Sequence, residues 1–249
     1  PAHPATPKSP ADPAMSASPL VLLQEGSGRP SFWFHPLGGR VLCYAGLAHH
    51  LAGRPLYGLE AGRSGEGLGV RLEELAGRYA EALLDAQPRG PYLLGGWSFG
   101  GLLAWETARY LEQAGREVAL LALIDSRPPD PAESLPVPDD ATLLPLLRAE
   151  TGAAEAELPA LLATVRSHLS ALSEYRPSPL HCPVSLFLAE RRPSGETADR
   201  AGLWRPLARG PFEVEPVPGG HFDLLEEPAV GILAAKLKRR LARIEEQPG

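Results

Sequence analysis

The sequence predicts an α/β fold built on a mostly parallel, doubly wound central sheet with flanking helices. From residue 20 onward, short apolar runs alternate with longer amphipathic stretches, as strands alternate with the helices that connect them. The early amphipathic stretches are each followed by Gly or Pro, residue types that end helices. The chain has 249 residues, enough for one such domain with a substantial core.

Seven short apolar runs are predicted to be strands, at residues 20–24, 32–35, 56–59, 92–96, 118–125, 184–189 and 212–217. Helices are predicted between them at residues 41–51, 71–87 and 100–114, and a long amphipathic helix closes the chain at residues 228–244. The alternation breaks after residue 125. Five prolines between residues 128 and 138 precede two predicted helical stretches, near 141–151 and 155–175, with no strand between them. This break predicts an inserted helical cap.

The first 19 residues differ in composition from the rest of the chain. They contain six prolines interleaved with Ala and Ser, which cannot build a core and favour an extended, semi-rigid tether. We interpret residues 1–19 as an interdomain linker within a larger polypeptide, and residues 20–249 as a single domain.

Composition excludes several classes of function. Acidic side chains outnumber basic ones by 30 to 24, a formal charge of -6 that does not favour binding to nucleic acid or to an anionic membrane. The longest strictly apolar run is far shorter than the roughly 20 residues that span a bilayer. Two cysteines cannot form a disulfide framework or a four-ligand zinc site. Because no secretory signal is recognisable either, we expect a cytoplasmic protein without a metal.

A candidate nucleophile stands in the pentapeptide from Gly96 to Gly100, which fits G-x-S-x-G with Ser98 at its centre. The motif follows a predicted strand and opens a predicted helix. A sharp strand-to-helix turn strains the serine backbone and brings neighbouring chains close, so glycines must flank it. The serine would then stand at the positive end of a helix, where developing negative charge is favoured.

A serine hydroxyl needs a base, and the base needs an acid to orient it. His221 lies in a Gly-rich loop between the last predicted strand and the last helix, as the order nucleophile, acid, base requires. Asp125 ends the most apolar strand and is the favoured acid. Glu190, which ends the next strand, is the alternative, although the two arginines that follow it give it an ordinary surface role.

Acyl transfer also needs backbone N–H donors for a tetrahedral oxyanion. One is expected from Phe99, the residue after the nucleophile. The second is expected from the turn at residues 35–39, where Pro36 has no N–H to offer. Leu37 and Gly38 remain as candidates, and we favour Leu37.

With these motifs in place, the chain resembles the terminal thioesterase domains of nonribosomal peptide synthetases, from about residue 20 to residue 241. The resemblance implies an α/β-hydrolase fold with a Ser-Asp-His triad and a helical lid inserted after the strand that bears the acid, here about residues 127–182. Stand-alone editing thioesterases are similar in fold but usually carry the acid where Glu190 stands. The position of Asp125 therefore favours the terminal type.

The resemblance further implies that Ser98 takes a peptidyl or acyl chain from the phosphopantetheine arm of an upstream carrier domain, in cis, and releases it by hydrolysis or macrocyclisation. His221 would serve both steps, and the domain itself would bind no cofactor. Two alternatives remain: a hydrolase of free esters on the same fold, and a silent module that only binds. His168 and Tyr175 in the expected lid are interpreted as packing or surface residues.

Overall fold

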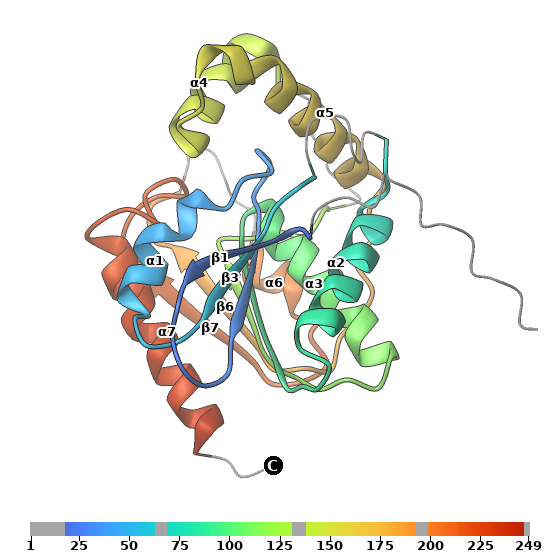
Figure 1. Ribbon diagram of the computed structural model, residues 1–249, viewed down its shortest axis with the longest axis vertical. Helices are drawn as coiled ribbons and strands as arrows, with labels where there is room; N and C mark the ends of the chain where they lie inside the picture. The colour runs from blue at the N-terminus through green and yellow to red at the C-terminus, as the bar shows by residue number, and fades with distance from the viewer. Residues whose placement is uncertain (1–17, 63–68, 131–137, 193–198, 247–249) are drawn as a thin grey trace, which may run out of the picture.

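The computed structural model describes residues 18–62, 69–130, 138–192 and 199–246. Its centre is a seven-stranded sheet in the order β1-β3-β2-β4-β5-β6-β7, in which β1 is antiparallel to β3 and the other pairings are parallel (Figure 1). The strands are β1 (Leu20–Gln24), β2 (Ser31–Phe34), β3 (Leu56–Leu59), β4 (Tyr92–Trp97), β5 (Val118–Ile124), β6 (Val184–Ala189) and β7 (Phe212–Val217). The predicted fold class is confirmed, and each predicted strand bound lies within one residue of the observed one.

The helices follow the predicted order with one addition. They are η1 (Leu42–Tyr44), α1 (Ala45–His50), α2 (Leu72–Ala86), α3 (Phe99–Gln113), α4 (Asp140–Thr151), η2 (Glu155–Glu157), α5 (Leu158–Glu174), α6 (Arg200–Trp204) and α7 (Ala229–Glu245). The first predicted helix is divided into a 3₁₀ turn and α1. The short helix α6 was not predicted, because five residues are too few to show a helical period.

Helices cover both faces of the sheet and create two apolar cores (Figure 1). One core lies under α2, α3 and α6, where the rings of Trp105 and Trp204 are 4.5 Å apart. The other lies under α1 and α7. Because both of its faces are covered, β5 is apolar and buried along its whole length, as expected for an inner strand of a parallel sheet.

Helices α4 and α5 are inserted between β5 and β6 and stand beyond one end of the sheet (Figure 1). They share a small apolar cluster of their own, against which the partly buried Leu37 packs. The cluster contains Leu143, Leu147, Leu161 and Val165. The insertion therefore reaches the turn that follows β2. The predicted linker, residues 1–19, lies almost entirely outside the described residues.

Candidate active site

Ser98 occupies a strained turn between β4 and α3. Its φ is 56° and its ψ is −122°, a region that non-glycine residues rarely adopt. The glycines around it are required by close backbone approach: a Cβ on Gly96 would lie 2.2 Å from a backbone atom of Gly100, and a Cβ on Gly100 would lie 2.2 Å from the Phe34 carbonyl oxygen. The tight turn at Ser98 therefore requires glycine at both flanking positions.

Two contacts fix the serine backbone. The Ser98 N–H donates to the Ile124 carbonyl at 2.9 Å, and the Ser126 hydroxyl donates to the Ser98 carbonyl at 2.5 Å. A Cβ on Gly101 would lie 1.8 Å from the Ser126 Oγ, so the glycine directly after the motif makes room for this bond. Sequence reasoning missed Ser126, since a serine after a strand carries no distinctive signal.

The structure brings Ser98, His221 and Asp125 together in a continuous line of hydrogen bonds. Strands β4 and β5 pair Trp97 with Ile124, so Ser98 and Asp125 follow adjacent strand ends. The His221 Nε2 lies 3.1 Å from the Ser98 Oγ, and its Nδ1 lies 2.7 Å from the Asp125 Oδ2. A carboxylate only accepts hydrogen bonds, so Nδ1 carries the proton and Nε2 is left to accept from the serine.

Asp125 is held in place from several sides. It has a φ of 44°, the other positive value at a non-glycine residue in the described chain. Its Oδ1 accepts from the Ala189 N–H at 3.1 Å, and the Arg200 Nη1 lies 2.6 Å from its Oδ2. Burial alone would raise the pKa of this carboxyl, but the His221 bond, the Arg200 cation and the Ala189 amide together lower it below its usual value.

The alternative acid, Glu190, has an exposed side chain just after β6, whereas Asp125 is 3% exposed. The His221 Nδ1 bonds to Asp125, so the geometry favours Asp125. Sequence reasoning did not find Arg200. It lies on the unpredicted helix α6, 75 residues from Asp125, and its Nη1 also donates to the Asp125 carbonyl at 3.1 Å.

Trp97 orients the loop that carries His221. Its indole N–H donates to the His221 carbonyl at 3.1 Å, and the two rings lie 5.0 Å apart. The Trp97 amide in turn donates to the hydroxyl of Tyr44 at 2.8 Å. Trp97, which fills the unspecified position before the serine in the motif, therefore helps to position the candidate base, His221.

The two residues predicted to supply the oxyanion donors, Leu37 and Phe99, lie next to Ser98 and His221. Leu37 and Phe99 both line a cavity of about 190 Å³ that also contacts Ser98 and His221. Phe99 is the first residue of α3, so its N–H precedes the helical hydrogen-bond ladder. No described residue accepts a hydrogen bond from the Leu37 N–H. The remaining lining includes Leu102, Asp125, Arg127, Pro128, Pro129, Asp130, Leu172 and Arg200.

A family model described as "Thioesterase domain" matches residues 29–241, which include every residue of this site. The chain belongs to this thioesterase family. Among curated proteins, the thioesterase domain is 29% identical, over 88% of its length, to the dimodular nonribosomal peptide synthase of Bacillus subtilis (strain 168). It is 44% identical, over 43% of its length, to malpinin synthetase of Mortierella alpina. It spans only 11% and 1% of these relatives, which are far longer proteins.

Solved structures agree with this membership. The thioesterase domain of NocB, in covalent complex with a fluorophosphonate nocardicin G analogue, superposes with a TM-score of 0.73 at 30% identity. That match covers 89% of this chain and 99% of the NocB domain. The four-domain nonribosomal peptide synthetase AB3403 matches with a TM-score of 0.77 at 26% identity, over 95% of this chain and 21% of its own.

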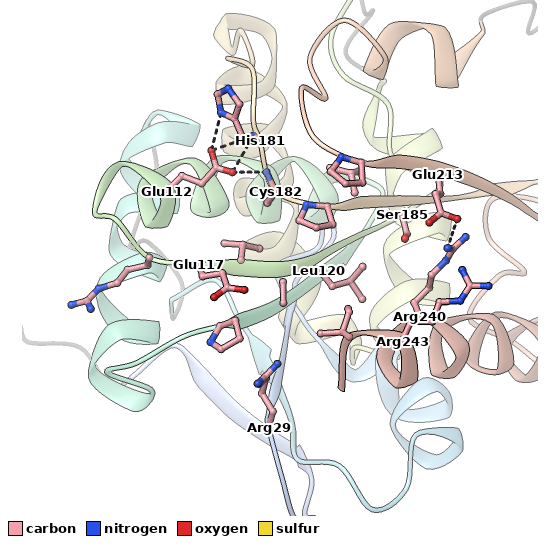
Figure 2. A pocket seen from close by; sticks show the side chains of 18 of the residues that line it. Arg29, Glu112, Glu117, Leu120, His181, Cys182, Ser185, Glu213, Arg240 and Arg243 are labelled. Atoms are coloured by element: carbon pink, nitrogen blue, oxygen red, sulfur yellow. Dashed lines mark hydrogen bonds and ion pairs between the residues drawn. The ribbon is translucent and has the colours of Figure 1, made fainter. Parts of the chain in front are cut away.

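A cavity of about 840 Å³ lies at the opposite end of the sheet from the site of this thioesterase (Figure 2). It is bounded by the amino ends of β5, β6 and β7 and by the end of α7, and it is ringed by Arg29, Glu117, Glu213 and Arg243. The candidate nucleophile and its partners do not line it. The candidate active site is therefore distinguished by its hydrogen-bonded groups and its backbone geometry, and not by the volume of its cavity.

Within the described ranges, none of the helices combines the length and apolar character of a membrane-spanning segment. The same residues contain no cluster of three or more His, Cys, Asp and Glu side chains arranged to hold a metal ion.

Proposed function

We propose that this thioesterase domain takes an acyl or peptidyl chain from a carrier-bound phosphopantetheine thioester onto Ser98 and releases it as an acid or a ring. The observation that carries the proposal is the line of hydrogen bonds from Ser98 through His221 to Asp125, at a cavity lined by two candidate oxyanion donors. This arrangement suits nucleophilic acyl transfer with a histidine base.

In the first step the Ser98 oxygen attacks the thioester carbon while its proton moves to the His221 Nε2. The carbonyl electrons move onto oxygen, and the N–H groups of Leu37 and Phe99 donate to the resulting oxyanion. When the intermediate collapses, the carbon–sulfur bond breaks and the thiol leaves with the proton from Nε2. Asp125 stays ionised throughout and stabilises the imidazolium, in keeping with its lowered pKa.

In the second step His221 removes a proton from a new nucleophile, which attacks the acyl ester of Ser98. Water gives a linear acid. An internal amine or hydroxyl of the chain gives a ring, and Ser98 leaves with the proton from Nε2 in either case. The insertion at about residues 127–182 would act as a lid over this ester, since Pro128 and Leu172 from it line the cavity.

The upstream partner in this proposal is a peptidyl or acyl carrier domain in cis, and the domain itself requires no bound cofactor. The multidomain synthetases among the relatives support this partner. So does the path of the chain. The Pro19 carbonyl accepts from the Glu60 N–H, and the next amide, that of Ala61, donates to the Gly39 carbonyl in the turn after β2. Pro19 therefore lies close to the turn that carries Leu37.

The direct test is intact-protein mass spectrometry after exposure to a panel of acyl-pantetheine thioesters, with wild type and Ser98→Ala in parallel. We expect an acyl adduct or thiol release that requires Ser98. Product masses then separate the acid from the ring.

Two outcomes would contradict the proposal. Cleavage of simple esters with no reaction towards any thioester would favour a hydrolase of free esters. Silence towards both classes would favour a module that only binds.

A further inference from the structure

Three aromatic rings pack together next to the candidate oxyanion donors. The His168 ring stacks on both His35 and Phe99, with ring centroids at 5.0 Å and 4.9 Å and planes inclined by 21° and 22°, and the His35 and Phe99 rings lie 6.2 Å apart, so the three rings form a triangular cluster. The three rings come from separate elements: His35 follows β2, Phe99 opens α3, and His168 belongs to α5 of the insertion. The ring cluster thus joins the inserted helix to both halves of the candidate oxyanion site.

His35 fixes the peptide that carries one donor. Its Nδ1 lies 2.7 Å from the Pro36 carbonyl oxygen and its Nε2 lies 2.7 Å from the Tyr79 hydroxyl. Burial, together with nearby His168, lowers the pKa of His35 to about 3, so the ring is neutral at pH 7. A carbonyl only accepts, so Nδ1 donates to Pro36, and Nε2 accepts from Tyr79.

The Pro36 carbonyl belongs to the same peptide unit as the Leu37 N–H, and it also accepts from the Gly39 N–H at 3.0 Å. In a trans peptide the carbonyl and the N–H point in opposite directions. Two donors on the oxygen therefore fix the direction of the Leu37 N–H, and they increase its polarity as well.

His168 fixes the following peptide. Its side chain is buried, and its Nδ1 donates to the Leu37 carbonyl oxygen at 2.8 Å. The donor and acceptor are 131 residues apart, so this bond forms only when α5 is seated against the turn after β2. The packing predicted for His168 is thus a specific contact with the oxyanion turn. Tyr175, the other residue considered with it, is buried and bonded to Glu106.

From this geometry we propose that His168 is a positioning residue through which the inserted helix α5 completes the oxyanion hole, so that the seating of α5 sets the rate of acyl transfer. The proposal rests on the proposed function, because it assigns the Leu37 and Phe99 N–H groups to the oxyanion. His168 does not touch the reacting atoms. It holds the Leu37 backbone and packs against the ring of Phe99, the residue whose backbone N–H is the other candidate donor.

The test compares two variants that separate the ring from the donor. His168→Phe keeps a stacked ring but has no group to donate to Leu37. His168→Asn loses the stacked ring but places an amide N–H close to the position of Nδ1. Ser170→Ala, at an exposed position of the same helix, is the control. Thermal unfolding of all variants establishes that each is folded, and His168→Ala replaces His168→Phe if the latter is not.

The readouts are the rate of Ser98 modification by a fluorophosphonate, whose phosphoryl oxygen occupies an oxyanion site, and kcat and KM for an acyl-pantetheine thioester. Loss of one oxyanion donor lowers kcat by about 10²–10³-fold, so a misplaced donor should give a decrease of about ten- to a hundredfold. We expect that decrease in both rates for His168→Phe, with KM changed less than about twofold and with the His168→Asn variant several times faster than His168→Phe.

The outcomes distinguish this inference from the function on which it rests. If the fluorophosphonate modifies wild type at Ser98 and modifies folded His168→Phe at the same rate, the role of His168 is wrong while the proposed function stands. If the unfolding temperature falls but the rates of the folded variant do not, His168 is only a packing residue. If wild type itself is not modified at Ser98, the proposed function fails first.

Discussion

The two ends of the central sheet are built differently. At the carboxyl end, a cavity of about 190 Å³ is surrounded by fixed polar groups and by two residues with strained backbone, Ser98 and Asp125. At the amino end, a cavity of about 840 Å³ is bordered by exposed or surface-paired charges such as Arg243 and Glu213. The smaller cavity is the one lined by the hydrogen-bonded series Ser98, His221 and Asp125.

This difference shows where the fold stores conformational energy. A non-glycine residue at positive φ is unfavourable by about 1–3 kcal/mol, and the carboxyl end contains two of them side by side. Each is retained by hydrogen bonds from neighbouring elements: Ser126 holds Ser98, and Ala189 holds Asp125. The amino end has salt bridges at its rim, which contribute little when exposed. Substitutions at the two ends should therefore differ strongly in effect.

The largest effect is expected for Asp125→Asn at the carboxyl end. The amide can no longer stabilise the imidazolium, and the expected decrease in kcat is about 10⁴-fold, with the protein still folded. Steady-state thioester turnover measures it, and circular dichroism checks the fold. Glu190→Gln is the matched control, because it removes an exposed carboxyl at the end of the next strand. If Asp125→Asn were nearly normal while Glu190→Gln were inactive, the acid would be Glu190.

A smaller effect, on stability, is expected for Arg200→Gln. The folded-state pKa of Asp125 lies below its unfolded value, so its stabilising contribution is present at pH values above the unfolded pKa and is lost as the pH falls through the folded pKa. Without the Arg200 cation that pKa rises and the contribution shrinks. We expect a loss of about 2 kcal/mol in the free energy of unfolding at pH 7.

Denaturant unfolding of wild type and Arg200→Gln at pH 7 and near pH 3 tests the sign of this effect. The difference between the two proteins should be larger at pH 7, where Asp125 is ionised in both. Arg205→Gln, with a cation at the end of the same helix and an exposed side chain, is the control. A difference that stayed constant with pH would mean that Arg200 contributes through packing alone.

The parts of this molecule that local sequence determines were predictable, and those that depend on distant contacts were not. Strand β5 is seven consecutive apolar residues, and the turn at Ser98 is specified by glycines within a few positions of it. By contrast, Arg200 meets Asp125 across 75 residues and His168 meets Leu37 across 131. Neither contact leaves a local pattern, because an arginine or a histidine on a helix is equally suited to a surface position.

A smaller effect on activity is expected for Trp97→Phe. The substitution keeps an aromatic ring against His221 but removes the indole N–H that donates to the His221 carbonyl. A hydrogen bond of this kind contributes about 1 kcal/mol, so kcat should decrease by about three- to tenfold while KM stays nearly constant. Stopped-flow measurement of thiol release gives both values. Trp97→Ala, which also removes the ring, should be slower; equal rates for wild type and both variants would show that the loop is held by other contacts.

The smallest effect is expected for Arg243→Ala, which tests the amino end of the sheet. Arg243 is exposed in the last turn of α7, where a cation interacts favourably with the helix dipole, and it borders the larger cavity. Its removal should change the free energy of unfolding by about 0.5 kcal/mol and leave thioester turnover within about twofold of wild type. The same assays as above measure both quantities. A tenfold decrease in turnover would mean that the two ends are coupled through the sheet. The volume of the cavity would then be a better guide to function than the strained backbone and fixed polar groups at the carboxyl end.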